Sequence, residues 1–68
     1  MLLKRGSKGD DVLQLQAALK GLGFNPGHVD GHFGRATELQ VEKFQESADV
    51  HDDGIVGKET LQILNDAL

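Results

Sequence analysis

The sequence predicts an all-α domain, a compact bundle of three helices, and three observations support this prediction. Apolar side chains recur every three or four residues in three separate stretches. A glycine-rich turn of related sequence precedes each stretch. The chain has 68 residues, which is the size of one small domain, so we expect a single domain spanning residues 1–68.

The first predicted helix runs from about Asp10 to Leu22. Its apolar stripe passes through Val12, Leu15 and Leu19 and ends at Leu22, in steps of three and four residues. Two acidic residues lie in its first turn, where the helix dipole favours negative charge, and Gly21 and Gly23 flank its last apolar residue and end the helix. These signals place both ends of the helix.

The second and third predicted helices have the same apolar period. They run from about Arg35 to Ser47 and from about Lys58 to Leu68. Their stripes consist of Thr37, Val41, Phe44 and Ala48 in the second helix, and of Thr60 or Leu61, Leu64 and Leu68 in the third.

An internal repeat introduces the helices. The segment Asp30–Thr37 recurs as Asp53–Thr60 at an offset of 23 residues, with six of eight positions identical or similar. A degenerate third copy, Gly6–Val12, precedes the first helix. Each helix is therefore introduced by the pattern G-x-x-G-x-x-(T/V), and the two later loops have the form D-G-x-x-G.

Each residue type in this turn motif has a predicted structural role. The first glycine permits a positive φ, and the second lets the chain turn into the helix. The aspartate accepts backbone N–H groups within the turn, the apolar residue between the glycines enters the core, and the threonine packs its methyl group inward. The predicted turn residues are Gly6, Gly9, Asp30, Gly31, Gly34, Thr37, Asp53, Gly54, Gly57 and Thr60.

Composition excludes several function classes. The net charge of −4 argues against a general nucleic-acid binder, because phosphate contacts need an excess of Lys and Arg. The chain has no Cys, so disulfides and zinc–thiolate sites are excluded, and we expect no cofactor. No apolar run approaches the roughly 18 residues of a membrane span, so we expect no membrane insertion.

Catalysis also has little support in the sequence. Ser7 and Ser47 lie near predicted helix ends without a neighbouring His, and we interpret both as capping residues. The pair Asp52-Asp53 lies in a polar loop, which offers no apolar pocket to shift a pKa for acid–base work. The sequence therefore predicts a protein that is not itself an enzyme.

Two metal-binding interpretations remain as alternatives to a metal-free protein. His28, Asp30 and His32 alternate as ligands on an extended segment do. The segment 49–60 resembles a calcium loop, but it has His51 at the third position and lacks the final bidentate glutamate. We expect exposed loop histidines in the first case and an ordinary turn in the second.

Four further side chains are predicted to be structural. Gln16 and Gln45 each follow an apolar residue on a predicted helix, and we expect half-buried amides that bridge the helix to the backbone of a neighbouring loop. Phe24 and Phe33 are expected in the core.

The order of these motifs resembles a known family. The chain contains, in order, the opening Leu3–Val12, the pair Leu15-Gln16, the loop Val29–Gly34, the pair Phe44-Gln45 and the loop Asp53–Gly57. This succession resembles the bacterial peptidoglycan-binding domain, the three-helix type found in cell-wall hydrolases and phage endolysins. The resemblance covers about Leu3 to Leu64, nearly the whole chain.

The resemblance implies a function. Such a domain is a non-catalytic module that anchors an associated murein hydrolase or endolysin to its polymeric substrate, so the implied partner is peptidoglycan, both glycan strand and stem peptide. The implied location is the cell envelope or the extracellular space, in the periplasm or cell wall, and we expect a monomer. The chain shows no signal peptide, which favours a phage endolysin or a truncated chain. The alternative is a protein-interaction or prodomain-like module of the same fold that does not bind glycan.

The candidate ligand-binding residues lie in and just after the loop between the first two predicted helices. A shallow groove there would present exposed hydrogen-bonding groups, and Arg35 would pair with a carboxylate of the stem peptide. Because the chain has no Trp or Tyr, we expect hydrogen bonds to outweigh stacking on sugars. The candidate set is Asn25, His28, Asp30, His32 and Arg35.

Overall fold

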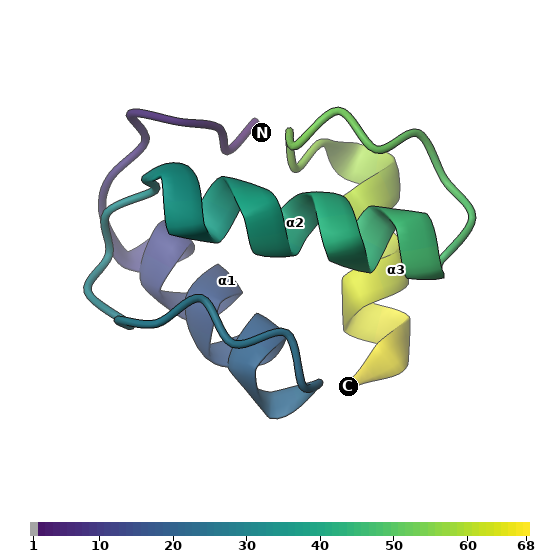
Figure 1. Cartoon of the computed structure of the whole chain (residues 1–68), viewed down its shortest axis with the longest axis horizontal. Helices are drawn as coiled ribbons and strands as arrows, with labels where there is room; N and C mark the ends of the chain where they lie inside the picture. Colours follow the sequence, from purple (N-terminus) through teal and green to yellow (C-terminus); the bar gives the residue numbers. More distant parts are fainter. Residues whose placement is uncertain (1) are drawn as a thin grey trace.

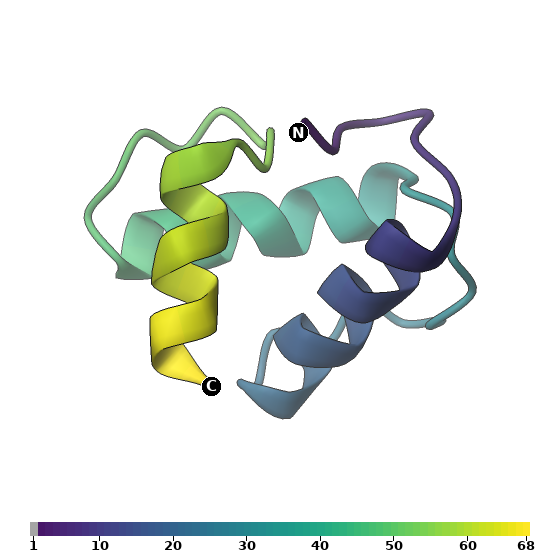
Figure 2. The same ribbon diagram turned by 180° about the vertical axis from the view of Figure 1, so that it is seen from behind.

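The computed structural model describes residues 2–68 and confirms the all-α prediction (Figure 1). Its helices are α1, Asp10–Gly21, α2, Arg35–Ser47, and α3, Lys58–Ala67. Helices α1 and α3 both lie on the same side of α2, as the two opposite views show (Figures 1 and 2). The predicted bounds of α2 are correct, and those of α1 and α3 extend one residue too far.

The predicted stripes meet in one hydrophobic core. Every helix contributes, and Phe33, the apolar residue of the first loop, is only 3% exposed, as predicted. Phe24 is half-buried and its ring lies edge-on to that of Phe44, with 5.7 Å between the ring centroids. The buried apolar residues are Leu3, Val12, Leu15, Leu19, Phe33, Val41, Phe44, Val56 and Leu64.

The prediction for the end of the third stripe is wrong. Leu68 is 70% exposed, and the core reaches only to Leu64 on this helix. Helix α3 ends at Ala67 and Leu68 is its C-cap, so this side chain lies beyond the last buried position of the stripe. At the start of α3, Thr60 is buried and Leu61 is half-buried.

The segment before α1 connects the two D-G-x-x-G loops. Isolated antiparallel bridges pair Leu3 with Val56 and Lys8 with His32. The Leu3–Val56 pair exchanges two backbone hydrogen bonds, of 3.0 and 2.8 Å. The N–H of Phe33 also donates to the carbonyl of Ser7 at 2.9 Å. The backbone groups of all three turn copies are thereby joined at one end of the molecule.

Glycines occupy the N-cap positions of all three helices. Gly34 and Gly57 have φ of −107° and −101°, and no side chain caps these helix ends. The first glycines of the two loops, Gly31 and Gly54, have φ of 78° and 74°, as predicted. In these two loops the left-handed conformation is thus needed at the first glycine and not at the second, whereas in the copy before α1 both Gly6 and Gly9 have a positive φ, of 96° and 118°.

Neither serine caps the N-terminus of a helix. The prediction that Ser7 is a capping residue is wrong, because Gly9 is the N-cap of α1. The Oγ of Ser7 accepts the N–H of Lys4 at 3.1 Å and closes a turn two residues before the N-cap of α1. The Oγ of Ser47 donates to the carbonyl of Phe44 at 2.7 Å in the last turn of α2.

Within residues 2–68, none of the helices has the length and apolar character needed to cross a bilayer.

Candidate functional site

One buried glutamine organises the first loop. The side chain of Gln16 on α1 is 1% exposed. Its Nε2 donates to the carbonyl of His32 at 2.9 Å, the Oγ1 of Thr37 at 3.0 Å and the Oδ1 of Asp30 at 3.3 Å. Its Oε1 accepts the N–H groups of Asp30 and Gly31 at 3.0 and 2.9 Å. A single amide therefore holds both ends of the loop against α1.

A second glutamine does the same for the second loop. Gln45 on α2 is also 1% exposed. It donates to the carbonyl of Ile55 at 2.9 Å and to Thr60 Oγ1 and Asp53 Oδ1, both at 3.1 Å. Its Oε1 accepts the N–H of Gly54 at 3.0 Å. The predicted bridge from helix to loop is confirmed at both glutamines, but the amides are fully buried, because the loops fold over them.

The loop aspartates accept backbone N–H groups, as predicted. The Oδ1 of Asp30 accepts from His32 at 3.0 Å, and that of Asp53 accepts from Ile55 at 2.9 Å. These backbone hydrogen bonds are the main reason why the pKa of each carboxyl lies below its ordinary value. Desolvation opposes them to a lesser extent, and the hydrogen bond from the glutamine amide lowers the pKa further. Both carboxylates are therefore ionised and structurally engaged at neutral pH.

Four of the five candidate residues line one shallow hollow of about 240 Å³. This loop hollow is open to solvent and lies where the first loop enters α2. The candidates that line it are His28, Asp30, His32 and Arg35. Asn25 does not line it, because its Oδ1 accepts the N–H of Gly27 at 2.9 Å within the turn.

Arg35 is the cationic group of the loop hollow. Its Nη1 donates to Glu38 Oε1 at 2.9 Å, and Arg5 lies 3.9 Å from the same oxygen. The Arg35 side chain is nevertheless 64% exposed. A guanidinium has five N–H donors, so one contact leaves it able to bind an additional carboxylate.

Neither metal-binding alternative is supported by the geometry. No group of three or more His, Cys, Asp or Glu side chains within residues 2–68 is arranged to hold an ion. The segment with His28, Asp30 and His32 is not a strand, and Asp30 turns its Oδ1 toward loop backbone. In the segment 49–60, Asp53 is used in the same way.

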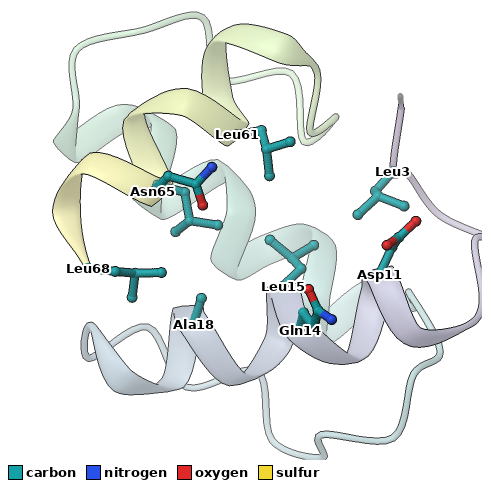
Figure 3. Close-up of a pocket in the computed structure, with 9 residues that line it drawn as sticks. Leu3, Asp11, Gln14, Leu15, Ala18, Leu61, Asn65 and Leu68 are labelled. Carbon is teal, nitrogen blue, oxygen red and sulfur yellow. The ribbon is translucent and has the colours of Figure 1, made fainter.

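A second hollow, which sequence reasoning missed, lies between α1 and α3 (Figure 3). This α1–α3 groove has a volume of about 130 Å³ and an apolar floor. Asp11, Gln14 and Asn65 are its polar lining residues, and its apolar ones are Leu3, Leu15, Ala18, Leu61, Leu64 and Leu68. One signal for it in the sequence is Leu68, because the apolar stripe of the third helix continues to this residue although the core ends at Leu64.

Known proteins of similar sequence share most of this chain. It is 43% identical over 63 residues to a spore cortex-lytic enzyme of Bacillus cereus, and the aligned region covers 93% of this chain and 24% of that protein. It is 50% identical over 56 residues to the N-acetylmuramoyl-L-alanine amidase CwlM of Mycobacterium tuberculosis, covering 82% of this chain and 14% of that protein. The chain thus spans a quarter or less of the length of these relatives.

A solved structure has the same fold. The crystal structure of the SleB N-terminal domain superposes with a TM-score of 0.96 at 42% sequence identity, covering 98% of this chain and 92% of that one. Residues 8–64 match the family described as "Putative peptidoglycan binding domain". The match includes all of α1 and α2, both glutamine-centred loops and most of α3. The chain therefore belongs to the peptidoglycan-binding domain family.

Proposed function

We propose that this domain binds peptidoglycan and holds an attached murein hydrolase or endolysin on its polymeric substrate. The observation that supports this most strongly is the family match over residues 8–64. The two relatives described above are named as a cortex-lytic enzyme and a muramoyl-alanine amidase, and each is several times longer than this chain. A tethered module raises the local concentration of an enzyme at its polymer without changing the chemistry.

The domain contributes binding and no bond-breaking step in this proposal. Asp30 and Asp53, whose pKa values are lowered, accept backbone N–H groups in their turns. A general acid working near neutral pH needs a raised pKa, which is the opposite shift.

Such a module acts at the cell wall, so the proposed location is the cell envelope or the extracellular space.

The loop hollow is the proposed contact for the stem peptide. Stem peptides carry carboxylates, and Arg35 offers free N–H donors beside His28 and His32 in this hollow. An exposed, shallow site buries little ligand surface, so a single domain should bind weakly and release readily.

Sedimentation with purified, protein-free murein sacculi tests the proposed function. The domain is fused to a fluorescent protein, and the fluorescent protein alone is the control. Sedimentation of the fusion that soluble muropeptides reduce is the expected result. A fusion that remains in the supernatant while circular dichroism shows native helicity would contradict the proposal and favour a protein partner.

A further inference from the structure

The α1–α3 groove is separate from the loop hollow. None of residues 2–68 lines both, and the groove is formed by helices that are far apart in sequence (Figure 3). Leu15 and Ala18 from α1 face Leu61 and Leu64 from α3 across its floor. An apolar hollow that is open to solvent is a place where a ligand can bury a small hydrophobic group.

The size of the groove limits what it can hold. Its volume of about 130 Å³ is well below the roughly 300–1,000 Å³ of pockets that enclose drug-sized ligands. A cavity of about 150 Å³ in another protein holds one benzene molecule. The groove therefore has room for one small substituent of a ligand and not for a whole sugar ring together with its neighbours.

Two of the three polar residues that line the groove are amides. Gln14 on α1 and Asn65 on α3 line the groove (Figure 3). Neither side chain makes a hydrogen bond within residues 2–68. In contrast, the amides of Gln16 and Gln45 are fully used within the fold. A primary amide both donates and accepts, so a free one at the rim matches another amide in the ligand.

The charge of the groove distinguishes it from the loop hollow. Among residues 2–68, Asp11 is its only ionisable lining residue, whereas the loop hollow contains Arg35 and two histidines besides Asp30. A carboxylate of the stem peptide would be repelled by Asp11 and attracted by Arg35. The groove is therefore suited to an uncharged part of the polymer.

We propose that the α1–α3 groove binds an acetamido group of the amino sugars in the glycan strand. Its methyl group packs against the floor formed by Leu15, Ala18 and Leu61, and its amide pairs with Gln14 or Asn65. The inference rests on the proposed function, because it assumes that the polymer is peptidoglycan. It divides the polymer between two surfaces, with glycan at the groove and stem peptide at the loop hollow.

The test uses peptide-free glycan strands, prepared from sacculi with an amidase, in three forms. The strands are N-acetylated, de-N-acetylated, or de-N-acetylated and then chemically re-N-acetylated. The fluorescent fusion should bind the first and third forms, and removal of the acetyl groups should weaken binding at least tenfold. An ammonium group cannot replace the methyl group on an apolar floor without a large desolvation cost.

Two pairs of variants locate the effect. Ala18→Leu fills the groove, and Ala17→Leu makes the same change at an exposed neighbour on α1. Asn65→Ala removes a rim amide, and Gln62→Ala removes an exposed amide of α3 that does not line the groove. We expect about tenfold weaker glycan binding for Ala18→Leu and Asn65→Ala only, with native melting midpoints checked for all four.

Three results would overturn the inference and leave the proposed function intact. In the first, the domain binds intact sacculi but not peptide-free glycan. In the second, it binds acetylated and de-N-acetylated strands equally. In the third, both groove variants bind glycan like the unmodified domain. Tighter binding of the de-N-acetylated strand that Asp11→Asn abolishes would instead assign the groove to a cation. If intact sacculi themselves are not bound, it is the proposed function that fails.

Discussion

Gln16 and Gln45 occupy equivalent positions in two successive copies of one structural unit. Each lies on the buried face of a helix, and each donates to the Oδ1 of the D-G-x-x-G aspartate and to the Oγ1 of the threonine in the first turn of the next helix. Each also accepts the N–H of the first loop glycine. The unit is therefore a helix, its glutamine, a loop and the start of the following helix, used twice.

Replacement of Gln16 by Ala should unfold much of the population. The substitution leaves the buried N–H of Gly31 and the Oγ1 of Thr37 without their partner, and each unpaired buried group costs about 1–3 kcal/mol. A domain of this size has only about 3–5 kcal/mol of stability from its core. Urea or thermal unfolding measures the loss, and Gln62→Ala on the exposed face of α3 should change stability by no more than about 0.5 kcal/mol. Equal midpoints for the two variants would show that the amide is dispensable.

The two glycines of the loop motif should respond oppositely to substitution. At Gly54, φ is +74° and a Cβ would lie 3.0 Å from Glu38 Cγ, so Gly54→Ala should destabilise the fold by about 1–3 kcal/mol. At Gly34, φ is −107° and no atom lies within 4 Å of a Cβ. Gly34→Ser adds an N-cap acceptor for α2 and restricts the unfolded chain, so it should stabilise by about 0.5–1 kcal/mol. Melting midpoints that shift in the same direction for both variants would contradict this assignment.

Stability should fall in acid because of Asp30 and Asp53. Their pKa values in the folded state lie below the ordinary 3.8, so the folded protein holds fewer protons on these groups than the unfolded chain. Their contribution is fully present above pH 3.8 and is lost as the pH falls through the lowered folded-state values. Melting midpoints recorded from neutral pH downward should therefore decline. The double variant Asp30→Asn, Asp53→Asn should show a shallower decline over this range, whereas Asp52→Asn, at an exposed neighbour, should follow the unmodified protein.

Arg35→Ala should weaken binding to sacculi without loss of fold. A charge-assisted hydrogen bond to a carboxylate contributes about 1.5–3 kcal/mol, which corresponds to a loss of about tenfold or more in affinity. Lys58→Ala is the matched control, because Lys58 occupies the same position in the second copy of the repeat. Sedimentation at increasing salt measures both. Equal retention of the two variants would remove Arg35 from the ligand contact.

Much of the fold is readable from the sequence because its signals are local. The helix bounds follow from apolar period and glycine position, and the positive φ of Gly31 and Gly54 follows from the turn motif. The hydrogen bonds of Asp30 and Asp53 span two residues, so they too are a property of the loop itself. The roles of Gln16 and Gln45 were predictable in kind, since a glutamine beside an apolar stripe needs a partner.

The candidate site was only partly predictable. His28, Asp30, His32 and Arg35 share a hollow because they are close in sequence, whereas Asn25 turns back onto Gly27 and leaves the set. An asparagine in a tight turn can accept a hydrogen bond from the backbone of its own turn, and the residue pattern does not show whether it does so or stays free for a ligand.

The sequence by itself determined the three helices, the repeated glycine turns and the resemblance to a peptidoglycan-binding domain. Each helix and turn depends on residues that are close together in the chain, and the resemblance depends on the order of these local motifs. Only the tertiary structure decided the pairing of Leu3 with Val56, the exposure of Leu68 and the α1–α3 groove. Each of these features depends on how segments that lie far apart in the chain are placed relative to one another. Their geometry depends on how the helices pack as bodies, and a local pattern of residues does not contain that information.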